Sequence, residues 1–488
     1  MQKDIYVLGA GPAGISCAHE LARRGVPAHV IERHPQVGGL CRTIPHGGFL
    51  FDVGPHRFFT KNEEVERLWH EALGDESVTV ARRTRILYRN HLFDYPLKPL
   101  AALRGLGLWT SLQAMASFAK IKLGPRRGRA RGSFEDWVVS QFGRVLYDIF
   151  FKTYTEKVWG ISCRDISAEW AGQRIKGLSL TSALLNSLKR GGGAASGVKS
   201  LVDQFDYPRL GAGQVYERLA EKARSQGAVF ALSTRVLGVR HGNNRIAGID
   251  VEGPGGESSQ LSAEHVFSSI PLTELILRLS PAPPDEVLEA ARTLYYRDHV
   301  TVNLVIRRRR PFPDNWIYVH DPRVRMARIA CYGNFSDGML RDVGKDALSV
   351  EYFTFAHDEL WQMADEQLIA LAGRELEQVG LLAAGDIEGA FVVRERDSYP
   401  VYYLGYRSSL DTIRAYLARF ENLTPIGRGG MYRYNNQDHA ILSGLLAARN
   451  FCAPGAHHDL WEINEENEYL EEKQLPLPMH AGPAAGAP

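Results

Sequence analysis

The sequence predicts an α/β fold: a Rossmann-type domain that carries an inserted, mainly helical domain and a further domain built on an antiparallel sheet. Two observations lead to this prediction. Residues 4–33 have the pattern of a strand, a glycine-rich turn, a helix and a second strand. Helical apolar spacing then dominates to about residue 200, and strand-like segments alternate with helices between Val266 and Val393.

The N-terminal unit contains the turn GAGPAG, in which Gly9, Gly11 and Gly14 stand in G-x-G-x-x-G register. In this register the first glycine permits a tight turn, the second lets the backbone approach a pyrophosphate, and the third lets the helix pack closely on the strand. Glu32 ends the second strand, where a carboxylate can accept hydrogen bonds from a ribose diol. The unit therefore predicts a dinucleotide site, with a glycine turn that binds nothing as the alternative.

The other elements follow from local patterns. A strand-like segment at 82–96 interrupts the helical region, and the sequence HGNN predicts a hairpin turn at 241–244. A last strand at 422–427 leads into a helix at 437–450. These patterns predict a discontinuous first domain at 1–65, 205–272 and 420–455, a helical domain at 66–204, a sheet domain at 273–419 and a disordered tail at 473–488.

Charge gives no reason to expect a nucleic-acid partner, because Lys+Arg 58 and Asp+Glu 56 leave a formal charge of +2. Two basic runs, at 124–132 and 307–310, are local exceptions. We predict a solvated loop for the first and a strand end for the second, with anion binding as the alternative for each. The five separated cysteines contain no C-x-x-C pair, which indicates neither a disulfide framework nor a zinc site and favours a reducing cytoplasm.

No secretory signal is predicted at the start of the sequence, because the first residues run directly into the glycine turn. The most apolar stretch, at 100–124, is interrupted by Arg104, Lys120 and Lys122. We therefore predict a buried helical segment there rather than a membrane span, with a helix on the membrane surface as the alternative.

A second glycine pair follows Glu32: the segment RHPQVGGLCRT contains Gly38 and Gly39 and then Arg42. This continuation resembles the FAD-binding segment of the glutathione-reductase-like flavoproteins, and within them the branch of amine oxidases, protoporphyrinogen oxidases and UDP-galactopyranose mutases. The resemblance implies tightly held FAD, with NAD(P)H as a transient reductant. The predicted cofactor contacts are Gly9, Gly11, Pro12, Ala13, Gly14, Glu32, Arg33, Gly38, Gly39, Leu40, Arg42, His56, Val236, Gly427, Arg428, Asn436, Gln437 and Asp438.

Three segments, at 51–69, 134–177 and 427–450, are similar to signatures of the UDP-galactopyranose mutases. The similarity implies that His56 lies beside the isoalloxazine, although a plain turn residue is the alternative. The middle of the chain, at 206–239 and 267–276, looks more like protoporphyrinogen oxidases and phytoene desaturases.

The stretch FFKTYTEKVWG at 150–160 concentrates aromatic residues in one place. Phe150, Phe151 and Tyr154 are three or four residues apart, so a regular helix would place them along one side. The resemblance assigns Phe151, Tyr154 and Trp159 to the nucleotide end of a substrate, and a buried aromatic seam is the alternative.

Two arginines, Arg174 and Arg428, are candidates to clamp a diphosphate, because a guanidinium presents paired donors to phosphate oxygens. Structural ion pairs are the alternative. Hydroxyl groups that could assist belong to Tyr399, Tyr432 and Tyr434. Asp438 is predicted to be the N-cap of the last helix, whose free N–H groups would face the flavin N1 and O2 region.

No Ser-His-Asp arrangement, carboxylate pair or metal cluster is evident in the sequence, so a cofactor is predicted to carry the chemistry. In the mutase interpretation His56, Arg174 and Arg428 serve the reaction, in which reduced flavin N5 attacks the anomeric carbon of a nucleotide sugar and pyranose and furanose forms interconvert. The alternatives are an FAD-dependent oxidoreductase of the amine oxidase or desaturase type and a flavin-binding protein without activity. The expected partner is a small-molecule substrate, a nucleotide sugar, and a homodimer is the alternative to a monomer.

Overall fold

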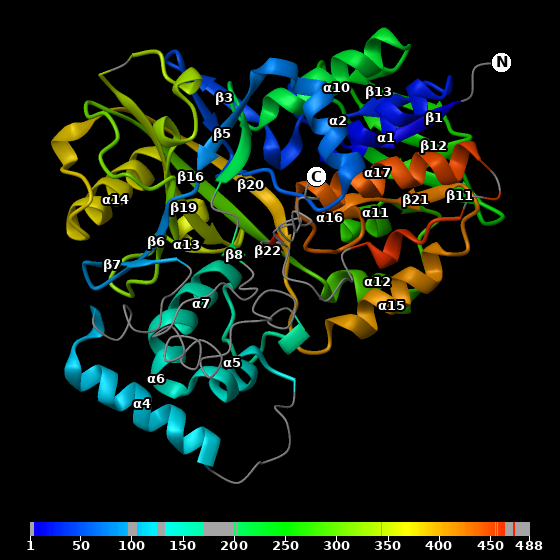
Figure 1. Ribbon diagram of the computed structural model, residues 1–488. Helices are drawn as coiled ribbons and strands as arrows, with labels where there is room; N and C mark the ends of the chain where they lie inside the picture. The colour runs from blue at the N-terminus through cyan, green and yellow to red at the C-terminus, as the bar shows by residue number, and fades with distance from the viewer. Residues whose placement is uncertain are drawn as a thin grey trace, which may run out of the picture.

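The computed structural model describes residues 4–95, 105–123, 132–169, 200–201, 204–342, 344–453, 455, 457–463 and 472–473. Two large sheets dominate the described chain, one of five strands and one of seven (Figure 1). Helices α4 (Leu108–Leu123), α5 (Phe134–Phe142), α6 (Arg144–Tyr147) and α7 (Thr153–Trp159) lie in the lower part of the view, away from the five-stranded sheet (Figure 1). The predicted fold class is confirmed, and the predicted domain boundaries stay predictions.

The five-stranded sheet is parallel throughout and forms the Rossmann-type unit. Its strands, in spatial order, are β10 (Val229–Ala231), β2 (His29–Ile31), β1 (Ile5–Leu8), β14 (His265–Ser268) and β21 (Leu423–Pro425). All four residues of β1 are buried, as expected for a parallel strand covered on both faces. The covering helices are α1 (Pro12–Arg23), α10 (Gly213–Ser225) and α17 (Gln437–Cys452).

The seven-stranded sheet is antiparallel except where β17 meets β6. Its strands, in spatial order, are β20 (Ile387–Pro400), β16 (Tyr296–Ile306), β19 (Asp346–Thr354), β18 (Arg328–Cys331), β17 (Trp316–Val319), β6 (Thr84–Tyr88) and β7 (His91–Asp94). The predicted strand-like segment at 82–96 is therefore confirmed, and it completes this sheet as β6 and β7. One face of β16 packs its aliphatic residues against α14 (Asp365–Gln378).

A four-stranded sheet contains the predicted hairpin. Its order is β13 (Ser258–Ser262), β12 (Arg245–Glu252), β11 (Arg235–Gly242) and β15 (Leu279–Ser280). Asn243 and Asn244 both have positive φ, +50° and +58°, which is typical of the two-residue turns that join antiparallel strands. Shorter ladders join β3 (Thr43–His46) to β4 (Phe49–Asp52), β5 (Ser77–Ala81) to β9 (Gln204–Pro208) and β8 (Ser200–Leu201) to β22 (Glu472–Lys473).

The remaining helices connect or cover these sheets. Side-chain caps define two of their starts, because Asn62 accepts the N–H groups of Glu64 and Val65 and Ser133 accepts that of Asp136. No helix in the described parts of the chain is both long and apolar enough to cross a membrane. These helices are α2 (Glu63–Leu73), α4 (Leu108–Leu123), α5 (Phe134–Phe142), α6 (Arg144–Tyr147), the π-helix η3 (Asp148–Lys152), α7 (Thr153–Trp159), α11 (Leu272–Leu277), α12 (Asp285–Thr293), α13 (Glu359–Gln362), α15 (Tyr406–Leu417) and α16 (Gly427–Gly430).

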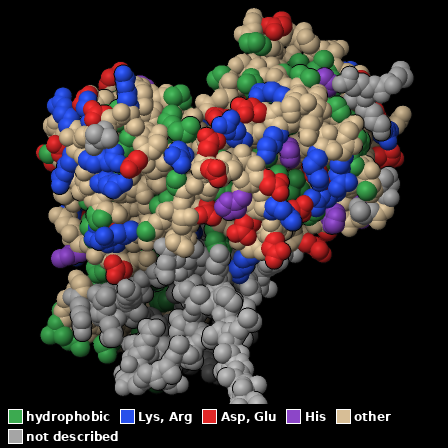
Figure 2. All heavy atoms as spheres, turned by 45° about the horizontal axis from the view of Figure 1, so that its top comes forward, with side chains coloured by type: hydrophobic (Ala, Val, Ile, Leu, Met, Phe, Trp, Pro, Cys, Tyr) green, Lys and Arg blue, Asp and Glu red, His purple; other side chains and the backbone are tan. Residues whose placement is uncertain are grey.

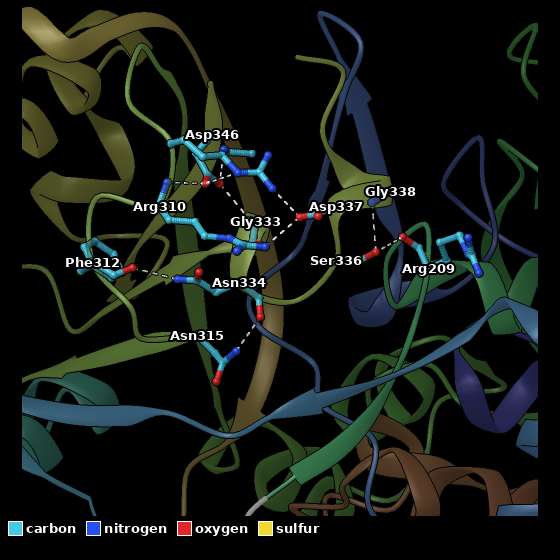
Figure 3. A network of polar contacts seen from close by, with 12 residues as sticks. Arg209, Arg310, Phe312, Asn315, Gly333, Asn334, Ser336, Asp337, Gly338 and Asp346 are labelled. Atoms are coloured by element: carbon cyan, nitrogen blue, oxygen red, sulfur yellow. Dashed lines mark hydrogen bonds and ion pairs between the residues drawn. The ribbon is translucent and has the colours of Figure 1, made fainter. Parts of the chain in front are cut away.

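The basic run at 307–310 lies at a strand end, as predicted, and two of its arginines are held by carboxylates (Figure 3). Asp346 accepts the backbone N–H of Arg310 at 2.9 Å, and Asp337 contacts the guanidinium groups of both Arg309 and Arg310. These two arginines are therefore structural, and anion binding is not needed to explain them. On the face shown in Figure 2, Lys and Arg are interspersed with Asp and Glu, in keeping with the small net charge.

Candidate active site

The glycine-rich turn joins β1 to the first turn of α1. Gly9 has φ +93°, and its N–H donates to the carbonyl of Ile31 at 2.8 Å. A Cβ on Gly14 would lie 1.9 Å from the carbonyl oxygen of Gly9, so only glycine fits where the helix meets the turn. Because the first N–H groups of a helix have no partner within it, this end of α1 can bind a pyrophosphate.

The second glycine pair lies against the first turn. Gly38, with φ +108°, donates its N–H to the carbonyl of Ala10 at 2.8 Å. A Cβ on Gly39 would lie 2.9 Å from the Cα of Gly11. The buried carboxylate of Glu32 accepts the N–H of Ala10 at 2.7 Å. The two segments thus form one backbone cradle, which side chains at the glycine positions would fill.

Arg42 connects this cradle to the seven-stranded sheet. Its Nη1 donates to the carbonyl of Gly39 at 2.9 Å, and its Nη2 forms a buried ion pair with Glu395 of β20. The charge of Arg42 is therefore balanced within the protein. Its contact with a phosphate stays a prediction.

His56 lies two residues after Gly54, which has φ +83°. Its Nδ1 donates to the carbonyl of Gly54 at 2.8 Å, which leaves Nε2 as an acceptor. Burial, and then the charges of Arg428 and Arg328, lower the pKa of His56 to about 3. The side chain is therefore neutral at physiological pH.

The N-terminus of α17 differs from the prediction in one respect. The N-cap is Asn436, whose extended backbone precedes the first helical residue, so the prediction that Asp438 caps the helix is wrong by two positions. Asp438 lies in the first turn, where a carboxylate is stabilised by the helix dipole. Gln437 accepts the hydroxyl of Tyr216 at 2.6 Å and donates to the carbonyl of Arg57 at 3.2 Å.

Arg428 lies at the centre of an aromatic cluster. Its guanidinium carbon is 5.0 Å from the ring centroids of both Tyr399 and Tyr434. The ring of Trp159 is 6.5 Å from that of Tyr399 and 5.9 Å from that of Tyr434. Arg428 donates only to backbone carbonyls, at Asn435 and Ser398, and forms no ion pair with a carboxylate of the described residues. The structure thus brings together four of the predicted site residues from three elements.

The stretch at 150–160 does not form one aromatic face. Residues Asp148–Lys152 are a π-helix, so the side chains rotate relative to the spacing of a regular α-helix. Phe150 meets Phe93, and Phe151 stacks on Phe142 at 5.0 Å. Tyr154 instead stacks on His320 at 4.8 Å. The prediction of a shared face for Phe150, Phe151 and Tyr154 is wrong for this reason.

Tyr432 lies apart from the aromatic cluster. It is fully buried in a hydrophobic core, where its ring contacts Tyr296 and its hydroxyl bonds the carbonyls of Tyr295 and Val401. Val236 is buried in the same core, and Arg33 is exposed. Arg174 lies outside the described residues. The roles assigned to these residues stay predictions.

The sequence reasoning missed a polar face on the seven-stranded sheet. Arg328 forms a bidentate pair with Glu351, with Nε–Oε1 2.9 Å and Nη2–Oε2 2.5 Å. His299 Nδ1 is 2.8 Å from the hydroxyl of Ser398, and burial, followed by Arg328 and His56, lowers the pKa of His299. This face therefore borders the same site as His56.

Alternation along two strands could have revealed this face. In HVTVNLVI and LSVEYFTF, polar residues occupy every second position of otherwise apolar strands, which is typical of one apolar and one polar sheet face. Two atoms on it, Thr301 Oγ1 and Asn303 Oδ1, are buried without hydrogen-bond partners among the described residues. Buried polar atoms are normally paired, so these two indicate a polar group that binds here.

The sequence matches the family model "Flavin containing amine oxidoreductase" over residues 12–451. The chain belongs to this family. Membership implies a flavin cofactor and an enzyme of the amine oxidase superfamily. The glycine cradle at the end of α1 and the buried polar atoms of Thr301 and Asn303, which have no hydrogen-bond partner among the described residues, are what a bound dinucleotide requires, so the residues fit the group.

Individual relatives of this family member include two mutases. The "Probable UDP-galactopyranose mutase" of Klebsiella pneumoniae is 26% identical over 181 residues, which cover 34% of this chain and 43% of that protein. The dTDP-fucopyranose mutase of Escherichia coli is 24% identical over 179 residues, covering 34% and 44%. The matched regions thus span less than half of either mutase.

The fold also resembles that in the crystal structure of reduced UDP-galactopyranose mutase. The TM-score is 0.80 at 20% identity, and the similarity covers 96% of this chain and 100% of that one. At this identity the similarity shows a shared fold.

Replacing Glu351 with glutamine is expected to lower the free energy of unfolding by about 3 kcal/mol, because the buried guanidinium of Arg328 loses its counter-charge. Urea unfolding of the flavoenzyme measures the change. The control is Glu388→Gln, at a pair with Lys345 in which both side chains are about one-third exposed, where solvent screens the charges and the loss should be much smaller. Equal losses of unfolding free energy in both variants would show that the buried ion pair stabilises the fold no more than the exposed one.

Stability should decrease as the pH falls below neutrality. Burial, followed by nearby arginine or lysine charges, lowers the pKa to about 3 in His56, His299 and His320. The unfolded chain binds these protons near pH 6.5 and the folded chain only near pH 3. Their contribution is thus complete above pH 6.5 and is lost as the pH falls, by up to about 1.4 kcal/mol per histidine per pH unit.

Asp52 acts in the opposite direction, because burial raises its pKa to about 7. The histidines outnumber it, so the net expectation is a loss of at least about 2 kcal/mol between pH 7 and pH 5. Denaturant unfolding at these two pH values, with His320→Gln as a variant in which the loss should shrink, measures the effect. Constant stability across this range would contradict the assignment of neutral buried histidines.

Proposed function

We propose that this flavoenzyme is a sugar-nucleotide mutase of the UDP-galactopyranose mutase type, which interconverts pyranose and furanose forms of a nucleoside-diphosphate sugar. The observation that carries the proposal is the guanidinium of Arg428, which lies against two tyrosine rings and has no carboxylate partner in the described part of the chain. A cation held in this way is available to a diphosphate. The two mutases among the relatives, both named for nucleotide sugars, support the same substrate class.

The charge balance of the site favours an anionic substrate. Arg428 forms no ion pair with a carboxylate of the described residues, whereas Arg328 is paired with Glu351 and Arg42 with Glu395. An arginine without a carboxylate partner attracts a diphosphate and repels the ammonium group of an amine.

When bound, a reduced flavin supplies a nucleophilic ring nitrogen for exchange at the anomeric carbon, and NAD(P)H would serve only as a transient reductant because the two sugar forms have the same oxidation state. The side chains of the protein bind and orient the substrate. Arg428 holds the diphosphate close to the sugar until the return step. Trp159 is buried against Tyr399 and Tyr434, and the resemblance assigns it to the base end of the substrate. His56 presents a neutral acceptor at Nε2. Arg174 is proposed as a second clamp.

A second candidate is an oxidoreductase that removes hydride from an amine or an alicyclic substrate. The description of the family model favours it. This candidate requires an oxidant such as oxygen in proportion to turnover, whereas a mutase consumes none.

Calorimetric titration of the oxidised holoprotein separates the two candidates at the level of binding. We expect UDP to bind measurably and a short diamine not to bind. Trp159→Ala should weaken UDP binding about tenfold, which is the effect of losing one stacking contact with a base. Trp109→Ala, which removes an exposed tryptophan of α4, is the matched control and should leave UDP binding unchanged. Binding of the diamine without UDP would contradict the proposal.

A further inference from the structure

Helix α4 presents apolar side chains on the side that faces away from the protein. Its inner side packs on α6: Ala114 is buried, the hydroxyl of Ser117 accepts the N–H of Arg144 at 2.9 Å, and the backbone at Phe118 lies against Gly143. The outer side carries large apolar residues with most of their surface exposed: Leu108 (80%), Trp109 (73%), Leu112 (50%), Met115 (59%) and Leu123 (87%).

The outer apolar residues form one continuous stripe. Leu108, Leu112, Met115, Ala119 and Leu123 are separated by three or four positions, which places them along one side of a helix, and all are exposed. This side is opposite the buried Ala114. Figure 1 shows α4 at the lower edge of the molecule, and hydrophobic side chains gather at the same edge in Figure 2. An apolar stripe of this length on a surface helix indicates an interaction site.

The charge around α4 is strongly one-sided. Between Asp94 and Glu135 the sequence contains no acidic residue and eight basic ones, Lys98, Arg104, Lys120, Lys122, Arg126, Arg127, Arg129 and Arg131. The whole chain, by contrast, has a net charge of +2. Lys120 is exposed on α4 beside the apolar stripe. For the basic residues that lie outside the described ranges, only the charge is considered.

We infer that α4 is a membrane-surface helix that binds bilayers containing anionic lipids. An apolar stripe with flanking basic residues is the pattern of a helix that lies in the interface, with its apolar side among the upper acyl chains and its cations at the lipid phosphates. The helix has 16 residues and does not meet the length of a span. A second copy of the chain fits this surface less well, because a symmetric contact would bring the exposed Lys120 of each copy to the same interface. The inference is independent of the proposed reaction.

Flotation of the full-length holoprotein with lipid vesicles tests the inference. We expect co-flotation with vesicles of phosphatidylcholine containing 30% phosphatidylglycerol, weaker binding at high salt, and little binding to pure phosphatidylcholine. The double variant Leu112→Glu/Met115→Glu should reduce the bound fraction at least about tenfold. Leu277→Glu, a change at a residue of α11 that is 51% exposed, is the matched control and should bind like the parent protein.

Three results would overturn the inference. The first is a parent protein that does not float with anionic vesicles. The second is a double variant that binds as well as the parent while retaining its flavin. The third is a parent dimer that becomes monomeric in the double variant without any lipid binding, which would show that a second copy covers the stripe. Because the parent is measured with and without anionic lipid and salt, the test stands even where a variant folds poorly.

Discussion

Replacing Arg428 with alanine is expected to lower kcat/KM for a UDP-sugar by roughly 100-fold or more. The guanidinium lies against the rings of Tyr399 and Tyr434 and can offer two charge-assisted hydrogen bonds to a diphosphate. Their loss corresponds to about 3 kcal/mol of transition-state binding. Steady-state kinetics on reduced enzyme, normalised to flavin content, measure the change.

The variant Arg428→Lys sharpens this prediction. Lysine keeps the positive charge but loses the planar fork that gives paired hydrogen bonds, so its activity should lie between those of the parent and the alanine variant. A parallel variant, Arg309→Ala, removes an arginine that is paired with Asp337 in the seven-stranded sheet domain and should leave kcat/KM unchanged. Full activity in Arg428→Ala would contradict the proposal that Arg428 holds the diphosphate.

Gly14→Ala is expected to yield protein almost free of flavin. The added Cβ would lie 1.9 Å from the carbonyl oxygen of Gly9 and 3.2 Å from Val7, so the helix must move away from the turn that holds the pyrophosphate. The visible absorbance of the flavin relative to protein concentration measures the occupancy. Gly242→Ala is the control, because a Cβ at this position meets nothing within 4 Å and should leave flavin binding intact. Normal flavin content in Gly14→Ala would contradict the geometry of the cradle.

The parts of the fold that were predictable depend on local sequence. The turn between β1 and α1 requires glycine where φ is positive or where helix and turn touch, and the hairpin requires residues such as Asn243 and Asn244 that tolerate positive φ. Such requirements leave a signature within a few residues. The fold class and the flavin cradle could therefore be predicted.

The parts that were missed depend on contacts between distant segments or on an irregular helix. Arg42 and Glu395 form an ion pair across 353 residues, and nothing near Arg42 in the sequence indicates its partner. The π-helix before Thr153 changes which side of the chain each aromatic residue occupies, and spacing rules assume a regular helix. The polar face with Arg328 and Glu351 was visible as alternation, but alternation alone does not show what the face borders.

The central claim is that this flavoenzyme isomerises a nucleotide sugar without net redox change. The most direct measurement is to incubate dithionite-reduced protein with UDP-galactofuranose, to separate the products by chromatography, and to record oxygen uptake in a parallel sample. The account predicts conversion to the pyranose form with no oxygen consumed in proportion to turnover. Failure to convert any UDP-sugar, together with oxygen uptake during oxidation of an amine or a polyene precursor, would contradict it.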